Sequence, residues 1–185
     1  MSWLIKIVDK NYQTKGVVQG YEGNNMTLKK ASTTASQVAI LAKLYLEGKP
    51  AEISDETTAQ LCDWLMGEFR QLPLNLQFSD YMRYENAEEM FADIEQGQLW
   101  VSADSYDSAI YPNPIYGFIF QGMHDYDHYL TDSDFSLEGE IVAYNFAAKR
   151  VPSLDIQKIL YSEIVLRTAA YLHLGHATNP KIVFL

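Results

Sequence analysis

The chain has 185 residues, of which 48% are hydrophobic, so it is long enough to bury one core and too apolar to remain disordered. Its formal net charge is -10, and the stretch between Arg83 and Lys149 holds thirteen acidic residues without one Lys or Arg. Such a stretch repels phosphate backbones, which excludes nucleic acid as a partner, and the single cysteine, Cys62, excludes an internal disulfide and a thiolate metal cluster.

The chain is expected to form a single domain, 1–185, in the cytoplasm. No apolar run reaches the length of about 18 residues that a membrane-spanning helix needs. The N-terminal segment has no long apolar core followed by a small-residue cleavage site, so no secretory signal is predicted there.

Helical periodicity and capping residues predict an all-α fold, a compact bundle of about six helices. Strands are expected to be scarce, because Val, Ile and Thr never alternate for long with polar residues. Residues 10–32, 101–114 and 131–136 are rich in polar and turn-forming residues and are predicted to be loops. Asn86 and Ser153 are expected to cap helices. The predicted helices span, in chain order, 33–48, 55–71, 86–97, 115–130, 137–150 and 154–174.

Two of the four histidines lie in the segment His-Asp-Tyr-Asp-His at 124–128. His124 and His128 are four residues apart, so on a helix they lie on one face, one turn apart. This placement allows two imidazoles to bind one metal ion. Such a pair alone is more often exposed on a helix surface, or satisfied within the core, than part of a metal site.

A third ligand must come from another element, and Glu140 is the best candidate. It falls within the apolar stripe of the predicted helix 137–150, so its carboxylate should point into the core and need a cation or proton there. The turn at 131–136 is short, which makes the two helices antiparallel neighbours and returns Glu140 to the level of His124 and His128. The apolar stripe consists of Leu137, Ile141, Tyr144 and Ala148.

Asp125 is expected either to be a further ligand or to orient a histidine, and its adjacency to His124 makes simultaneous coordination tight. Two imidazoles with one or two carboxylates form a site without sulfur. Such a site suits Zn²⁺ with a water in an open position, or non-haem Fe²⁺, and Mg²⁺ is a third ion that we consider. Zinc or iron can polarise a ring carboxylate or phenolate, whereas direct activation of oxygen needs a redox metal.

Other chemistry-bearing side chains have simpler explanations. Glu163 lies four residues before Arg167, which predicts a helical ion pair, with the orientation of a ligand histidine as an alternative role. His173 and His176 flank a glycine near a helix end and are predicted to be on the surface. Four aromatic residues either fill the core or line a lipid pocket: Tyr111, Tyr116, Phe118 and Phe120.

The pattern His124-Asp125-x-x-His128, eleven residues and then Glu140, resembles the signature of the ubiquinone (coenzyme Q) biosynthesis protein 4 family. It matches that signature in residue type and in spacing, and the resemblance covers roughly residues 115–170. It implies an α-helical fold in which these four residues are the metal ligands, usually assigned to zinc.

The resemblance also implies a partner and a setting. The expected ligand is a prenylated quinone precursor or another prenyl lipid, bound by a protein peripheral to a membrane. The expected assembly is a complex of biosynthetic enzymes, and a homo-oligomer is compatible with it. The activity implied is support for oxidative decarboxylation of the quinone head group, with the catalytic residues left open.

Three alternative functions share parts of this pattern. A zinc peptidase of the HExxH type, or another zinc-dependent hydrolase, would use Glu as general base where the shorter Asp125 stands, which disfavours it. An HD-type phosphohydrolase needs an earlier histidine ligand, and no histidine precedes His124. A non-catalytic lipid-binding or scaffold protein with a structural metal stays open.

Overall fold

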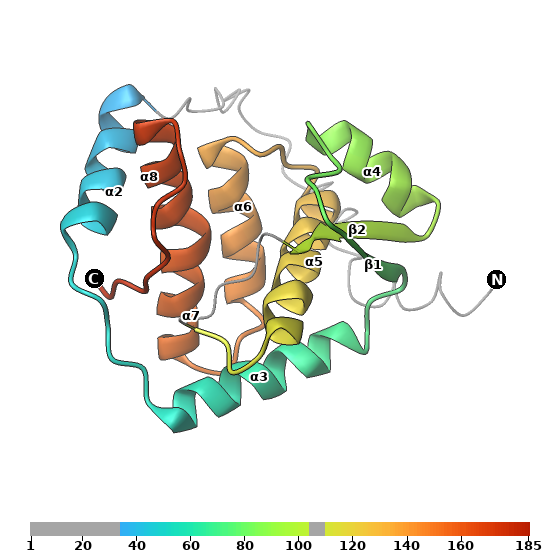
Figure 1. Ribbon diagram of the computed structural model, residues 1–185, viewed down its shortest axis with the longest axis horizontal. Helices are drawn as coiled ribbons and strands as arrows, with labels where there is room; N and C mark the ends of the chain where they lie inside the picture. The colour runs from blue at the N-terminus through green and yellow to red at the C-terminus, as the bar shows by residue number, and fades with distance from the viewer. Residues whose placement is uncertain (1–33, 104–109) are drawn as a thin grey trace, which may run out of the picture. The chain divides into compact units, whose positions relative to one another are not determined.

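The computed structural model describes residues 34–103 and 110–185, all within one compact unit, Ser32–Leu185. The predicted loop-rich segment 10–32 lies outside the described residues. The prediction of a mostly helical fold is confirmed (Figure 1). The helices are α2 (Ala35–Glu47), α3 (Asp55–Phe69), α4 (Ala87–Glu95), α5 (Pro114–Thr131), α6 (Leu137–Ala148), and α7 (Leu154–Leu160), which continues through the π-helical segment η3 (Tyr161–Leu166) into α8 (Arg167–Leu174).

Side-chain caps set the helix starts, so the predicted bounds are close to the observed ones. The side chain of Asn86 accepts a hydrogen bond from the backbone N–H of Glu89 at 3.0 Å, and Ser153 accepts one from Ile156 at 3.3 Å. Each bond satisfies a donor that the first helical turn leaves without an intrahelical partner. Both predicted caps are therefore confirmed.

Two short strands were not predicted. β1 (Asn75–Ser79) and β2 (Gln98–Ser102) pair in parallel, with Asn75 opposite Gln98, and α4 forms the crossover between them. Residues 101–102 thus belong to a strand and not to the predicted loop 101–114. Strands of five residues are too short for a period of two to stand out from the sequence.

The main core lies among α3, α5, α7 and η3, where Leu65, Ile119 and Ile159 are at most 1% exposed. Burying each such side chain contributes about 1.5–3 kcal/mol. A smaller core around Met90 and Leu99 joins α4 and β2, and aromatic residues of α5 pack against it. Helix α5 is thus held on two sides. No described helix combines the length and the apolar character that crossing a bilayer takes.

Helices α5 and α6 are antiparallel neighbours, as predicted, and lie side by side in Figure 1. Asp132 ends α5 in the left-handed conformation, with φ 52°, and its N–H bonds to carbonyls of the last turn. Ser136 then caps α6 by accepting a hydrogen bond from the N–H of Gly139. The chain reverses within these few residues, which brings the first turn of α6 beside the last turns of α5.

Candidate metal centre

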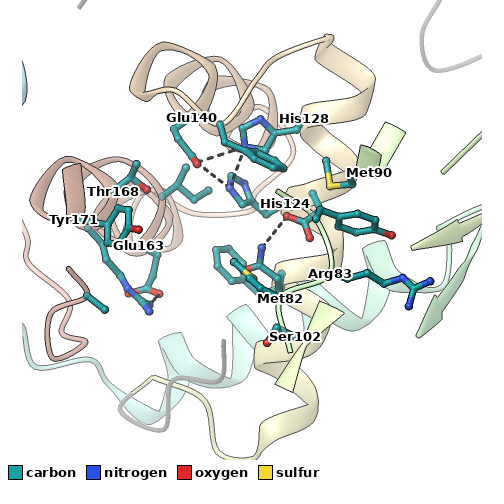
Figure 2. A pocket seen from close by; sticks show the side chains of 18 of the residues that line it. Met82, Arg83, Met90, Ser102, His124, His128, Glu140, Glu163, Thr168 and Tyr171 are labelled. Carbon is teal, nitrogen blue, oxygen red and sulfur yellow. Dashed lines mark hydrogen bonds and ion pairs between the residues drawn. The ribbon is translucent and has the colours of Figure 1, made fainter. Parts of the chain in front are cut away.

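Three of the predicted ligand side chains converge between α5 and α6 (Figure 2). Nε2 of His124 lies 2.9 Å from Oε2 of Glu140, and Nε2 of His128 lies 3.5 Å from the same oxygen. The two Nε2 atoms are 3.3 Å apart. The side chains of His124 and Glu140 are 11% exposed and that of His128 is 1% exposed. The histidine pair and the inward-pointing carboxylate are therefore found at one place.

The turn after α5 orients His128. Its Nδ1 lies 3.1 Å from the carbonyl oxygen of Ser133 and 3.0 Å from the hydroxyl of the same residue. An Nδ1–H that donates to this carbonyl selects the tautomer whose Nε2 lone pair faces Glu140. The Ser133 hydroxyl is also 2.8 Å from that of Thr131. Ser133 was not among the predicted site residues, because a serine in a polar turn has no sequence signature of such a role.

Aromatic packing holds His124. Its ring stacks on that of Phe120, one turn earlier in α5, with centroids 6.1 Å apart and planes 7° from parallel. The ring of His128 meets it edge-on, with centroids 4.6 Å apart. These contacts restrict the imidazole to an orientation in which Nε2 faces Glu140.

The close approach of Gly139 to the backbone of Asp134 positions Glu140. Gly139 packs so tightly on the preceding turn that a Cβ atom there would lie 1.8 Å from the carbonyl oxygen of Asp134. Only glycine fits that contact, and Glu140 follows it directly in the first turn of α6, where the helix N-terminus favours a carboxylate.

The buried face of α6 is offset from the predicted apolar stripe. Glu140 does point inward, but Ile141, Tyr144 and Ala148 are only partly buried. Tyr144 instead meets the ring of Tyr161 edge-on, with centroids 5.2 Å apart. The buried face contains Leu137, Gly139, Glu140, Ala143 and Ala147.

The three ligand atoms fit one metal ion. Ligands about 2.05 Å from a tetrahedral ion lie about 3.3 Å from one another, and the three observed separations bracket that value. A point equidistant from the three atoms in their plane lies about 1.9 Å from each, so an ion fits just outside that plane. Oε2 of Glu140 is buried and receives no aligned hydrogen bond from the described residues, despite its closeness to His124. The three donor atoms therefore lie close enough together to share one ion.

Without metal the same atoms form a charged pair. Burial alone would lower the pKa of His124, but the carboxylate of Glu140 outweighs it and raises this pKa to about 9. Burial alone would raise the pKa of Glu140, but the neighbouring His124 lowers it to about 2. The site therefore keeps Glu140 as a carboxylate, ready to bind a cation, while a proton occupies His124.

Asp125, the fourth predicted ligand, is not among the converging groups. Its carboxylate accepts a hydrogen bond from Nε2 of Gln121 at 2.7 Å, and burial raises its pKa to about 6. Adjacent residues of a helix point about 100° apart, so Asp125 and His124 diverge. Asp127 points to Arg150, whose Nη2 lies 2.8 Å and 2.9 Å from its two oxygens.

The three ligands lie on the wall of a cavity of about 550 Å³, a volume typical of small-molecule sites (Figure 2). Of the four aromatic residues expected either to fill the core or to line a pocket, Phe120 and Tyr111 line this cavity. Tyr116 packs against the main core, and Phe118 packs on Phe78 with ring centroids 4.9 Å apart. The wall also includes apolar side chains from several elements, namely Met82, Met90, Trp100, Ile164 and Leu172.

The remaining predicted side chains are placed as expected. Glu163 forms the predicted ion pair with Arg167, with Oε2 and Nη1 3.0 Å apart, and both line the cavity. His173 and His176 are exposed. Comparisons with protein-family models, with curated proteins and with solved structures give no match for the chain.

Proposed function

We propose that the protein binds one divalent metal ion through His124, His128 and Glu140, and uses it to hold the oxygen-bearing head group of an apolar small molecule. The observation that carries this proposal is the convergence of three donor atoms on the wall of a cavity. Structural zinc sites are closed by four protein ligands, whereas three converge among the residues that the structure describes. The cavity adjoins these three, which favours a site that a ligand can enter.

The donor set favours Zn²⁺ or Fe²⁺ over Mg²⁺, since two of the three donors are imidazole nitrogens. Either ion, when bound, supplies a Lewis acid for a ring carboxylate or phenolate, and iron adds redox chemistry. The chain's own residues prepare the site: Ser133 holds the Nδ1 proton of His128, and Phe120 shields one face of His124 from water.

A prenylated quinone precursor is the proposed occupant. The resemblance of the motif to the ubiquinone biosynthesis protein 4 family supports this choice, as does the apolar wall beside the metal ligands. Each CH₂ of a tail that enters such a cavity contributes about 0.8 kcal/mol. Met82, which lines the cavity, is 75% exposed, and Tyr81 beside it is 56% exposed. The exposure of these apolar side chains beside the cavity supports entry of the tail from a membrane surface. The protein would then bind that surface peripherally.

The test is binding of a prenylated quinone to the metal-loaded protein in detergent, followed by mass spectrometry of the retained lipid. The wild type is expected to retain it. Phe120→Trp, which fills part of the cavity, should keep the metal and lose the lipid. Should the wild type fold, hold metal and retain no lipid, the pocket proposal fails. Retention of lipid without any metal-dependent turnover would favour a non-catalytic lipid-binding protein.

A further inference from the structure

Arg150, just beyond the end of α6, joins three helices. Its Nε lies 2.8 Å from Oε2 of Glu68 in α3, and its Nη2 lies 2.8 Å and 2.9 Å from the two oxygens of Asp127 in α5. Its Nη1 donates to the carbonyl of Phe146 in α6 at 3.2 Å, and the guanidinium lies 4.6 Å from the centre of the Phe146 ring. One planar cation thus holds fixed points on α3, α5 and α6.

These contacts are better shielded than ordinary surface ion pairs. The Asp127 side chain is 4% exposed, and those of Arg150 and Glu68 are 23% and 24% exposed. Because one planar guanidinium contacts both carboxylates, Asp127 through Nη2 and Glu68 through Nε, it fixes their positions relative to each other as well as each distance. The pair Lys158–Asp155, at 36% and 55% exposure, is the kind of contact that contributes little.

The position of Asp127 connects this network to the metal centre. It directly precedes His128 and lies three residues after His124, so its anchoring limits the rotation of the same helical turn that aims both imidazoles at Glu140. The loop 131–136 joins α5 to α6 at one end only. Metal–ligand distances tolerate deviations of only about 0.2 Å, so a small rotation of α5 against α6 would spread the three donor atoms.

We infer that Arg150 is a positioning residue for the metal centre: through Asp127 and Glu68 it sets the rotation of α5 that keeps His124 and His128 in register with Glu140. This inference rests on the proposed metal binding. Arg150 is neither one of the three ligands nor part of the described lining of the cavity. It acts through the placement of α5, so its loss should change metal affinity and coordination geometry without removing a ligand.

The experiment measures Zn²⁺ affinity by competition with a chromophoric chelator, and the visible spectrum of the Co²⁺-loaded protein, well below the unfolding temperature. Arg150→Met is expected to weaken Zn²⁺ binding about 10- to 100-fold and to alter the Co²⁺ spectrum. Arg150→Lys, which can pair with Asp127 or Glu68 but not span both, should fall between it and the wild type. Lys158→Met, the matched loss of an exposed cation, should behave as wild type.

Glu68→Gln removes one of the two carboxylate contacts of Arg150 at a partly exposed position, and it keeps the test valid if Arg150→Met does not fold. It should weaken Zn²⁺ binding several-fold. The inference is overturned if folded Arg150→Met, or Glu68→Gln in its place, keeps the wild-type affinity within about twofold and an unchanged Co²⁺ spectrum. A different outcome is that the wild type binds neither Zn²⁺ nor Co²⁺. That result would overturn the proposed function itself, and the inference about Arg150 with it.

Discussion

Replacing Glu140 with Gln should remove the proton that His124 holds in the metal-free protein. The carboxylate raises the pKa of His124 to about 9 against the effect of burial, so at pH 7 this imidazole is charged. In Glu140→Gln the burial remains while the opposing charge is gone, and the pKa should fall to about 6.5 or below. The difference of roughly 2.5 units corresponds to a coupling of about 3 kcal/mol between the two side chains.

Imidazole ¹H–¹⁵N spectra of the metal-free protein, recorded as a function of pH, measure this pKa directly. A wild-type His124 that titrates near pH 6.5 would contradict this expectation, because Glu140 would then exert no electrostatic effect on the imidazole.

The same pair makes the stability of the metal-free protein depend on pH. The contribution of His124 is fully present below about pH 6.5 and is lost as pH rises through about 9, because its folded-state pKa is raised. The contribution of Glu140 is present above about pH 4.5 and is lost as pH falls toward about 2, because its pKa is lowered. Metal must also displace the His124 proton, so apparent affinity should rise about tenfold per pH unit from pH 7 toward 9.

Two further predictions concern the residues that hold the ligands. Gly139→Ala should lower the thermal unfolding midpoint and weaken metal binding, because the Cβ atom of the alanine would overlap a backbone carbonyl. The control is Gly67→Ala, where a Cβ atom meets open space. This variant should be neutral or should stabilise α3 by about 0.5–1 kcal/mol. Equal midpoints for the two variants would contradict this. Ser133→Ala should reduce Zn²⁺ affinity less than tenfold in a chelator competition, since the backbone carbonyl still accepts from His128, and a complete loss of binding would show that the hydroxyl is the essential partner.

Local sequence signals predicted the helices and the three converging ligands. The spacing of His124 and His128 fixes their common face, and the short turn at 131–136 returns Glu140 to them, so both features follow from helical geometry. The offset face of α6 did not follow, because Gly139 and the small residues Ala143 and Ala147 carry little hydrophobic signal although they are buried.

The remaining features depend on contacts between distant segments. Arg150 meets Glu68 and Asp127, which lie far apart in the chain, and no local pattern connects them. The periodicity of residues 154–174 predicts one continuous helix. It does not predict the π-helical segment Tyr161–Leu166 within that stretch. Asp125 accepts a hydrogen bond from Gln121 and does not join the ligands. The sequence pattern from His124 to Glu140 does not reveal this contact.

The metal content per chain shows whether His124, His128 and Glu140 bind an ion. The protein and its variants are loaded with Zn²⁺ or Fe²⁺, the latter without oxygen, freed of excess ion by gel filtration and measured by elemental analysis. About one ion per chain is expected in the wild type and in the control His173→Ala, and almost none in folded His128→Ala and Glu140→Ala. Equal metal content in wild type and both ligand variants, or no retained metal in the wild type with either ion, would contradict this expectation.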